Sequence, residues 1–378
     1  MPRRRLPKAE PKTRFAVVLA ARNEEAVIAS TVETLLHQRY PKDLYDVFVV
    51  PNNCTDDTEG AARRAGAEII PCLAPCRNKG DALHQAFAAL DHQNYDAYCV
   101  FDADNLVDPD FLARMNDAFC AGYRVAKGVQ RAMNPHSGWV AGCYDLYFEH
   151  SNLMFNRPRM TLKLSSKLVG TGFAVSSSLI REMGGWNTHT MAEDAEFAAQ
   201  CAMAGERVCW VPEALSYDEE PTTFRQSMVQ RRRWCSGVMQ VAKCYVPKLL
   251  AAGIRTFRFL PIDFALFLLM PLVQVLALLP GIRVIWQTIA AGNYLALVLS
   301  GASFWVSMMA TALAFTIVGK RPLKQMLPSI LLYPLFTASW YPLHILALFC
   351  RVKVWKPIAH GSAKRELADK PQGSFSAL

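Results

Sequence analysis

Two aspartates in the segment FDADN, residues 101–105, are separated by one residue and directly follow an apolar run. Two carboxylates at the end of a buried strand can share a divalent cation, and Mg²⁺ and Mn²⁺ readily bridge carboxylate and phosphate oxygens. Asp102 and Asp104 are therefore candidate ligands of such a cation, or of a cation bound to a diphosphate. Because a D-x-D pair is common, a solvated turn with a helix cap is the competing interpretation.

A second acidic pair, Glu193-Asp194, precedes a stretch with helical spacing and follows the turn Gly184-Gly185-Trp186. A carboxylate in such a position can act as a general base. A carboxylate at the start of a helix also interacts favourably with the helix dipole, so an N-terminal cap explains the pair almost as well.

Three arginines and a tryptophan stand together in Gln230-Arg231-Arg232-Arg233-Trp234, shortly before the most apolar part of the chain. Guanidinium groups can grip a pyrophosphate and stack on flat groups, and an indole ring can stack on a sugar. The same residues would also suit an anchor at the level of the lipid headgroups.

A fourth polar segment is Arg77-Asn78-Lys79-Gly80. Its glycine lets the backbone approach a phosphate closely, and its lysine supplies a positive charge. A polar loop before a helix is the simpler interpretation of this segment.

These polar segments follow apolar stretches in the first 220 or so residues, where strands and helices alternate. The predicted strands are Phe15–Ala20, Asp46–Val50, Glu68–Ile70 and Tyr98–Phe101, and the predicted helices are Glu24–Gln38, Asp56–Ala65 and Lys79–Leu90. Asp108-Pro109 predicts the N-cap and first residue of a further helix. The alternation predicts an α/β fold with a mostly parallel sheet covered on both faces. The polar clusters would meet at the carboxyl edge of that sheet, where ligands bind.

The composition changes near residue 257, because residues 257–350 contain no Glu and a single Asp, Asp263. Three uncharged runs lie in this part of the chain: Phe264–Ile282, Tyr294–Val318 and Gln325–Cys350. Each is long enough to form a helix that crosses the hydrocarbon of a membrane. The third run contains three prolines, so we expect an interfacial helix followed by a broken or re-entrant span. A very apolar soluble helical domain is the alternative.

The 378-residue chain is 52% hydrophobic and 19% charged, with a net charge of +9. These proportions exclude disorder, coiled coil and collagen. Residues 1–14 carry a net charge of +5 and residues 351–378 carry +4, so the part between is neutral. Basic tails suit an anionic membrane surface, although a solvated terminus explains the first tail equally well. Because the charge lies in the tails, nucleic-acid binding is not expected.

The eleven cysteines show no repeated pair, and the C-x3-C of Cys72 and Cys76 has no neighbouring His. We therefore expect no zinc site and interpret the cysteines as reduced core residues, which indicates a cytosolic face. The basic N-terminus is not followed by the apolar segment of a signal peptide. The motifs G-x-G-x-x-G, G-x-x-x-x-G-K-[ST], G-x-S-x-G and H-E-x-x-H are missing, and with them the usual marks of four enzyme classes.

In their order along the chain, the motifs resemble those of the family 2 glycosyltransferases with a GT-A fold, the group that contains cellulose, chitin and hyaluronan synthases. The resemblance covers residues 15 to about 245. It is carried by AARNEE at 20–25, NNCTDDT at 52–58, NKGDAL at 78–83, FDADN at 101–105, GTGF at 170–173, AED at 192–194 and QRRRW at 230–234. The last fits the Q-x-x-R-W pattern of membrane-integrated polymerising members.

This resemblance implies a role for each motif. Asp104, with Asp102, would hold Mg²⁺ or Mn²⁺ on the donor diphosphate, and Asp194 would be the general base that deprotonates the acceptor hydroxyl. Gly170–Phe173 would border the acceptor site. The residues expected to contact substrates are Asn52, Asp57, Lys79 and Gly80 in the nucleotide pocket, Asp102 at the metal, Gly172 at the acceptor, and Gln230, Arg233 and Trp234 over the pyrophosphate and acceptor sugar.

The sequence departs from the family pattern in three places. Asn52 stands where the family usually has an acidic residue, although an amide can still bond a uracil edge because it both donates and accepts. Ala192 replaces a usual threonine. The N-terminal spans of several synthases are missing, so a translocation pore would be built from fewer helices.

The resemblance implies an inverting hexosyltransferase at the inner membrane of a cell. The chain would consist of a basic tail, 1–14, a cytoplasmic GT-A domain, 15–256, that ends in interfacial helices, a membrane region, 257–350, and a second basic tail, 351–378. It would transfer glucose or N-acetylglucosamine from a UDP-sugar to a growing β-linked polysaccharide or oligosaccharide. Inverting transfer needs a base and charge relief on the leaving UDP, but no covalent nucleophile. Expected partners are a saccharide or lipid-linked acceptor and membrane lipids, and a homo-oligomer is left open. The alternatives are single transfer to a lipid acceptor and a non-catalytic membrane subunit.

Overall fold

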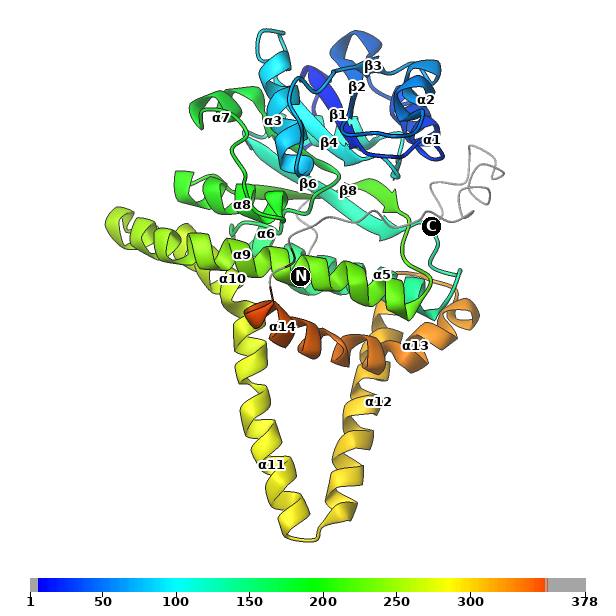
Figure 1. The fold of residues 1–378 in the computed structure, drawn as a ribbon, viewed down its shortest axis with the longest axis vertical. Helices are drawn as coiled ribbons and strands as arrows, with labels where there is room; N and C mark the ends of the chain where they lie inside the picture. The colour runs from blue at the N-terminus through cyan, green and yellow to red at the C-terminus, as the bar shows by residue number, and fades with distance from the viewer. Residues whose placement is uncertain (1–5, 351, 353–378) are drawn as a thin grey trace.

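The computed structural model describes residues 6–350 and residue 352, and it consists of a sheet domain above a pair of long projecting helices (Figure 1). Most of the predicted second basic tail, 351–378, lies outside the described residues. The described part of the first tail packs on the sheet domain, where the backbone N–H of Thr13 donates to Asn116 Oδ1 at 3.1 Å.

One eight-stranded sheet forms the centre of this domain, in the order β3-β2-β1-β4-β7-β6-β8-β5. Its strands are β1 (Phe15–Ala21), β2 (Tyr45–Pro51), β3 (Glu68–Ile69), β4 (Ala97–Asp102), β5 (Leu106–Val107), β6 (Val125–Ala132), β7 (Phe173–Ser176) and β8 (Val208–Asp218). Strands β1, β2 and β4 are continuous apolar runs because helices cover both of their faces. In register, Ala20 on β1 lies beside Val50 on β2 and Asp102 on β4, so their carboxyl ends meet at one edge.

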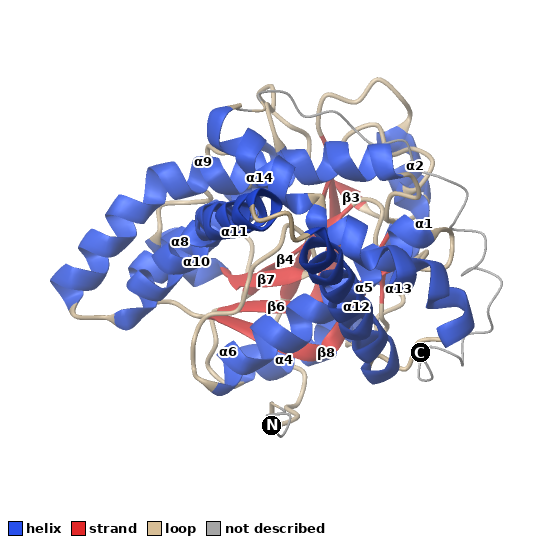
Figure 2. Ribbon diagram, turned by 90° about the horizontal axis from the view of Figure 1, so that it is seen from below, coloured by secondary structure: helices blue, strands red, loops and turns tan. Residues whose placement is uncertain are grey.

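The helices of the sheet domain form two layers. They are α1 (Ile28–Leu36), α2 (Thr58–Arg64), α3 (Lys79–Leu90), α4 (Phe111–Cys120), α5 (Trp139–His150), α6 (Arg157–Thr161), α7 (Ser177–Glu182), α8 (Glu193–Ala204) and α9 (Phe224–Thr256), with a 3-10 turn at Lys42–Leu44 and a π-helical segment, Ser151–Asn156, joining α5 to α6. Helices α1, α2 and α4 share a core with one face of the sheet, and α3, α7, α8 and α9 share a core with the other. In the view from below, α5 and α9 lie beneath the sheet (Figure 2).

The fold confirms the predicted α/β class and the mostly parallel sheet, and it corrects one detail. Four of the seven strand pairings in the sheet are parallel, while β7 runs antiparallel to both β4 and β6, and β5 antiparallel to β8. Asp108-Pro109 does not start the next helix. Asp108 Oδ1 instead accepts a hydrogen bond from the N–H of Asp110 at 2.9 Å, which forms a turn, and α4 begins at Phe111.

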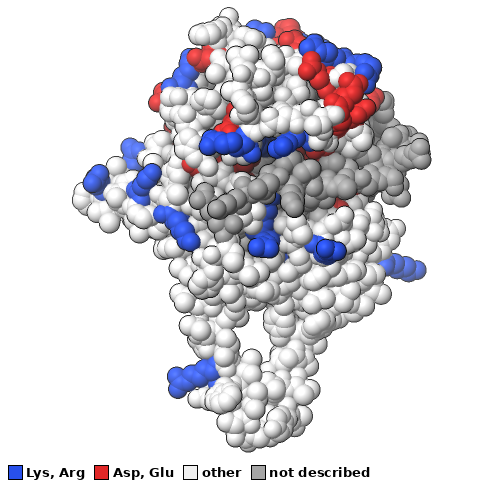
Figure 3. All heavy atoms as spheres, in the orientation of Figure 1, with Lys and Arg blue, Asp and Glu red and all other residues white. Residues whose placement is uncertain are grey.

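The apolar part of the chain forms α10 (Phe259–Leu276), α11 (Leu278–Ala290), α12 (Tyr294–Val318), α13 (Leu323–Ala338) and α14 (Trp340–Phe349). Within the described residues, three stretches are long and apolar enough to cross a membrane: 259–290, 294–318 and 323–349. Helices α11 and α12 project from the sheet domain as a hairpin (Figure 1), and no residue of α11 is buried. Figure 3 shows no acidic side chain on this hairpin.

The third apolar stretch has a different placement. Helices α13 and α14 lie across the base of the hairpin, beneath the sheet domain, rather than beside α11 (Figures 1 and 2). They pack against α5 and α9, and Tyr333 and Phe336 share a core with Tyr144 of α5. Their direction differs from that of α11 and α12, and the interfacial or re-entrant placement of this stretch stays a prediction.

Three buried ion pairs attach the chain on both sides of the hairpin to one continuous helical segment, α5 to α6. Arg321, after α12, donates to Asp145 Oδ1 at 3.0 Å and to Glu149 Oε2 at 3.2 Å, and its side chain is 9% exposed. Arg159 pairs with Asp263 near the start of α10, and both side chains are largely buried. Because a buried charge without its partner is costly, these contacts fix both ends of the hairpin.

We expect Arg321→Met to destabilise the protein by about 3–5 kcal/mol, since it leaves two buried carboxylates without their cation. A loss of this size lowers the thermal midpoint of a domain of this length by roughly 6–12 °C. Differential scanning fluorimetry of the detergent-solubilised protein measures the shift. The matched control is Arg232→Met, because Arg232 is exposed on α9. Equal midpoints for both variants would contradict the attachment.

Candidate active site

A cleft of about 550 Å³ lies at the carboxyl edge of the sheet. Its walls come from the ends of β1, β2, β4 and β8 and from the first turns of α3, α8 and α9. The residues singled out from the sequence that line it are Asn52, Lys79, Asp102, Asp104, Asp194, Gln230, Arg233 and Trp234. Side chains separated by up to 182 positions in the sequence thus share one cavity.

Three other residues predicted for the site do not line this cleft. Asp57 pairs with Arg64 at 2.8 Å, and both side chains are mostly exposed. A Cβ at Gly80 would approach Thr188 Oγ1 to 2.4 Å, and a Cβ at Gly172, where φ is +60°, would approach Ser216 Oγ to 2.9 Å. The two glycines therefore permit close packing behind the walls of the cleft rather than contact with a ligand in it.

The ammonium group of Lys79 joins α3 to the end of β4. Its Nζ pairs with the carboxylate of Asp102 and donates to the carbonyl of Gly170 at 2.6 Å. Burial alone would lower the pKa of Lys79, but the carboxylates of Asp102 and Glu193 outweigh burial, and its pKa is raised. Lys79 is therefore a permanent positive charge on the floor of the cleft.

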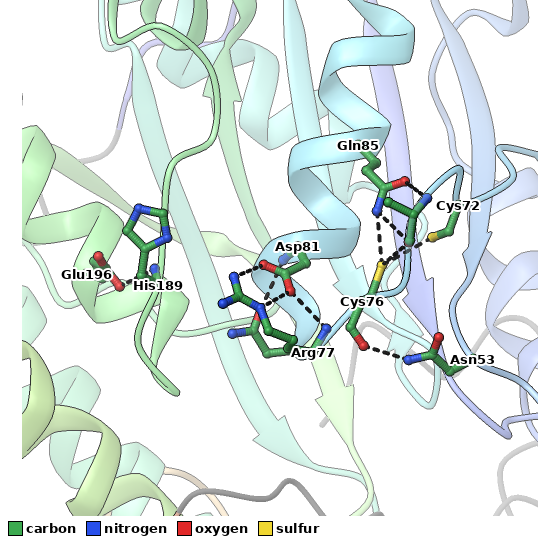
Figure 4. A network of polar contacts seen from close by, with 10 residues as sticks. Asn53, Cys72, Cys76, Arg77, Asp81, Gln85, His189 and Glu196 are labelled. Carbon is green, nitrogen blue, oxygen red and sulfur yellow. Dashed lines mark hydrogen bonds and ion pairs between the residues drawn. The ribbon is translucent and has the colours of Figure 1, made fainter.

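The loop before α3 is held by its own side chains (Figure 4). Arg77 donates to Asp81 from its backbone N–H and its guanidinium at 2.8–3.0 Å, and Asn78 caps α3 by accepting from the N–H of Asp81. Cys76 contributes its carbonyl to Asn53 Nδ2 at 2.6 Å, and its sulfur lies 3.5 Å from that of Cys72. The loop that presents Lys79 is thus tied to the end of β2.

The eleven cysteines are unpaired throughout residues 6–350, as expected of reduced thiols, but they are not all core residues. Cys244 and Cys350 are exposed. Burial raises the pKa of the Cys72 thiol to about 12, with the neighbouring Cys76 second, so this thiol is protonated at neutral pH.

Asn52 presents a hydrogen-bond acceptor at the end of β2. Its side-chain Nδ2 donates to the carbonyl of Ala21 at 3.0 Å, and the residue is 6% exposed. This bond uses one N–H of the amide, so Oδ1 and the second N–H remain for a group in the cleft. A nucleobase N–H edge is a suitable partner.

Negative charge is concentrated around Asp102 and Asp104. The amide Nδ2 of Asn105 donates to Asp218 Oδ1 at 3.0 Å and to Asp104 Oδ1 at 3.4 Å, which holds these two carboxylates beside each other. Burial raises the pKa of Asp218 well above its usual range, and Asp104 and Asp102 raise it further. A cation between these groups would relieve the repulsion.

The residues of the cleft fit a divalent cation that a substrate helps to bind. No group of three or more His, Cys, Asp or Glu side chains in residues 6–350 converges as a complete metal cage. Mg²⁺ and Mn²⁺ do not need one, since Mg²⁺ in particular is usually held by one or two carboxylates plus substrate phosphates. Asp102 and Asp104 supply such a pair.

The second acidic pair stands at the first turn of α8. Burial raises the pKa of the Glu193 carboxyl to about 7, with Asp194 second and Lys79 opposing. Burial also raises the pKa of Asp194, while the N–H of Ala195, 2.7 Å from Oδ1, opposes the shift. Gly170 lies directly beside the pair, since a Cβ there would be 3.5 Å from Glu193 Oε1 and 3.8 Å from Asp194 Oδ2. Both carboxyls therefore gain a proton at a higher pH than an exposed carboxyl does.

Helix α9 divides the arginine cluster between two faces. One face, defined by helical spacing, lines the cleft with Gln226, Gln230, Arg233 and Trp234. Arg231 points the other way, is fully buried, and donates to the carbonyl of Phe336 in α13 at 3.0 Å. Burial lowers the pKa of Arg233, and Asp102 opposes this shift. Arg233 thus faces the cleft, while Arg231 faces the apolar helices.

Sequence reasoning missed the wall after β8. Asp218, Glu219, Glu220, Pro221 and Thr222 line the cleft, together with Gln130 of β6. The acidic run before the arginine cluster was a usable signal, because three consecutive carboxylates at a strand end repel one another unless they serve a ligand. Gln130 carries no comparable signal.

Comparisons with known proteins agree with this geometry. A family model described as "Glycosyltransferase like family 2" matches residues 11–237, which is more than half of the chain. The "Probable glycosyltransferase YdaM" of Bacillus subtilis is 25% identical over 359 residues, covering 90% of this chain and 83% of that protein. The "Beta-monoglucosyldiacylglycerol synthase" of Synechocystis sp. is 27% identical over 244 residues, covering 61% of this chain and 49% of that protein.

A solved structure shares the fold. The mannosyltransferase PcManGT from Pyrobaculum calidifontis, in complex with GDP-Man and Mn²⁺, superposes with a TM-score of 0.64 at 20% identity, over 92% of this chain and 91% of that one. The expectation of a GT-A domain followed by apolar helices is confirmed. The chain spans about half the length of the Synechocystis relative.

We expect Asp104→Asn to weaken UDP binding in the presence of Mn²⁺ by at least about tenfold, because it removes one charged ligand of the cation, and contacts to charged groups contribute about 1.5–3 kcal/mol. Isothermal titration calorimetry with UDP and Mn²⁺ measures the affinity. The matched control is Asp57→Asn, outside the lining of the cleft, which we expect to bind UDP within about twofold of the wild type. If Asp57→Asn weakens binding as much as Asp104→Asn, the assignment of the nucleotide pocket is wrong.

Proposed function

This chain belongs to the glycosyltransferase-like family 2, and from that premise we propose that it transfers glucose or N-acetylglucosamine from a UDP-sugar to a hydroxyl group of a lipid-borne acceptor at the cytoplasmic face of a membrane. The observation that supports this function is one cleft in which the Asp102–Asp104 pair, the Glu193-Asp194 pair and the cationic face of α9 meet. The opposite face of α9 packs on α13 and α14.

The donor side of the cleft suits a nucleoside diphosphate. Asn52 offers an acceptor to the N–H edge of uracil, and Lys79 and Arg233 supply positive charge for the two phosphates. Mg²⁺ or Mn²⁺, held by Asp102 and Asp104, would supply the remaining charge neutralisation of the leaving UDP. Among the solved structures of this fold, PcManGT was obtained with GDP-Man and Mn²⁺.

The reaction then follows from the positions of the charged groups. Asp194 accepts the proton of the acceptor hydroxyl, whose oxygen attacks the anomeric carbon as the bond from that carbon to the diphosphate oxygen breaks. The electron pair of the broken bond leaves with UDP, and Lys79 and Arg233 stabilise the charge that develops there. A single displacement inverts the anomeric carbon and needs no covalent intermediate on the protein.

The acceptor is proposed to be lipid-borne because of the place of α9. Its first turns carry Gln226, Gln230 and Trp234 into the cleft, and Trp234 also stacks on Trp340 of α14 with ring centroids 6.4 Å apart. The acceptor side of the cleft therefore adjoins the helices at the base of the apolar hairpin. An acceptor held by lipid chains would reach it from the headgroup level.

A second candidate is extension of a growing β-linked saccharide. The pattern Gln230-x-x-Arg233-Trp234 favours it, because this pattern is typical of polymerising members of the family. The product separates the two candidates. We would incubate the protein, UDP-glucose or UDP-N-acetylglucosamine and Mn²⁺ with lipid acceptors and determine product mass. A product larger by one sugar supports single transfer, a ladder of masses supports polymerisation, and no transfer to any acceptor would contradict both.

We expect Asp194→Asn to lower the rate of transfer by about 10²- to 10⁴-fold, because the amide cannot accept a proton and a positioned base typically contributes this much. The affinity for UDP should change by less than about threefold, since the amide keeps the size of the carboxylate. If the residue only caps α8, the variant should retain most of the activity, because Asn is itself a good cap.

The pH dependence of the wild type provides a second check on the base. Because burial raises the pKa of Asp194, the acid limb of the pH–rate profile should lie above the usual range of an aspartate carboxyl, and transfer should fall as the pH decreases through that limb. An acid limb that begins only below about pH 5, near the usual carboxyl range, would contradict the assignment.

The proposed orientation places the sheet domain in the cytoplasm. The chain next to the hairpin, on the side of the sheet domain, carries Arg255, Arg258 and Lys320. Basic residues are more frequent on the cytoplasmic side of a membrane. In spheroplasts that carry the protein with Cys244→Ser, an impermeant maleimide should label a cysteine introduced by Ala291→Cys, between α11 and α12. Native Cys350 should be labelled only after permeabilisation. Labelling of Cys350 in intact spheroplasts would show that the third apolar stretch crosses the membrane.

A further inference from the structure

One carboxylate of the cleft has no task in the proposed reaction. Glu220 is 4% exposed and lines the cleft, and its Oε2 is buried without a hydrogen-bond partner among residues 6–350. A buried polar atom left unpaired costs about 1–3 kcal/mol. Such an atom at the surface of a cleft indicates that a ligand completes its hydrogen bonding.

The position of Glu220 is fixed by its backbone. Its N–H donates to Asn134 Oδ1 at 2.9 Å, and its carbonyl accepts from Asn134 Nδ2 at 2.9 Å. Asn134 is itself buried. This reciprocal pair of hydrogen bonds holds the residue at the boundary between β8 and α9, so Glu220 is held in place in the absence of a ligand.

A second unpaired acceptor lies on the same side of the cleft. Gln230, on α9, lines the cleft, and its Oε1 is buried without a partner among the described residues. Phosphate oxygens and carbonyl groups cannot satisfy Gln230 Oε1 or an ionised Glu220, because they are acceptors themselves. A group that serves both side chains must therefore be able to donate a hydrogen bond.

A hydroxyl group fits Glu220 in both of its protonation states. Burial raises the pKa of its carboxyl well above the usual range, and Asp218 and Asp104 raise it further. A hydroxyl can donate to the carboxylate and can either donate to or accept from the carboxylic acid. A cationic occupant would instead compete with the pair Asp102 and Asp104, which already suits the metal.

We propose that Glu220 forms a binding subsite for a second hydroxyl of the acceptor, beside the hydroxyl that reacts, and that the acceptor is therefore a lipid carrying a sugar or other polyol headgroup. This inference rests on the proposed function, which requires a lipid-borne hydroxyl but no second one. It assigns the hydroxyl to the acceptor because Glu220 shortly precedes α9, whose Gln230 and Trp234 line the cleft where it adjoins α14.

The test compares two acceptors with the purified protein in a polyoxyethylene detergent, which contributes no sugar of its own. Octyl β-D-glucoside carries neighbouring hydroxyls, and 1,2-dioctanoyl-sn-glycerol carries a single one. We expect the wild type to prefer octyl β-D-glucoside by at least about tenfold in kcat/KM, because a hydrogen bond to a charged group contributes about 1.5–3 kcal/mol.

The variant Glu220→Met removes the acceptor atoms but keeps the length of the side chain. It should abolish this preference by raising KM for octyl β-D-glucoside, while the KM for the UDP-sugar and the slow release of UDP in water stay within about twofold. Glu220→Gln, which keeps a hydrogen-bonding group, should retain most of the preference. The matched control is Glu213→Met, on β8 shortly before Glu220 but outside the lining of the cleft, which should leave the preference unchanged.

The outcomes separate this inference from the proposed function. If Glu220→Met lowers the use of both acceptors equally, or lowers UDP release in water, Glu220 serves the donor or the metal and the inference is overturned. An unchanged preference overturns it as well. If the wild type releases UDP but transfers sugar to neither acceptor, the proposed function fails, and the inference fails with it.

Discussion

Mutual repulsion among carboxylates is the constraint on which the active site depends. Eight Asp or Glu residues and four Lys or Arg residues line the cleft within the described part of the chain. Burial raises the pKa of Glu193, Asp194, Asp218 and Glu220, and neighbouring carboxylates raise it further. A divalent metal would bring positive charge to the cleft, and the hydroxyls of an acceptor would bring hydrogen-bond donors.

The rest of the sheet domain holds this unfavourable arrangement in place. The register of β1, β2 and β4 brings Asp102 to the carboxyl edge, and Lys79 reaches it from a loop that is fastened to the end of β2. Helix α9 closes the opposite side, with its ligand-facing residues and Arg231 on different faces. Helix α9 therefore contacts both the cleft and the apolar helices, so a shift of the apolar helices would move residues that line the cleft.

Much of this arrangement could be predicted from the sequence, because buried strands and polar strand ends leave a direct pattern. The range Lys79–Leu90 is α3 in the structure, and the continuous apolar runs of β1, β2 and β4 located the edge at which Asp102 lies. The family resemblance added the order of the motifs, and it placed Asp194 and Arg233 in the same cavity.

Other features could not be predicted from the sequence, for physical reasons. Asp57 lies in an exposed turn and pairs with Arg64 at 2.8 Å rather than lining the cleft, and the pattern of polar residues does not encode that direction. The antiparallel direction of β7 depends on tertiary pairing with β4 and β6, which a short apolar run does not encode. Hydropathy likewise predicts that α13 and α14 could cross a membrane, but it does not predict their packing on α5 and α9, which sets the direction of the two helices.

The ion pairs on both sides of the hairpin have a mechanical consequence. The α5–α6 segment contains Asp145, Glu149 and Arg159. Their partners are Arg321, which follows α12, and Asp263, near the start of α10. A domain joined to its anchor by one flexible linker could swing and sample many heights above the bilayer. Two rigid attachments to a single segment hold the cleft at one height. The protein would then act as a ruler that selects acceptors by how far their reactive hydroxyl stands above the lipid chains.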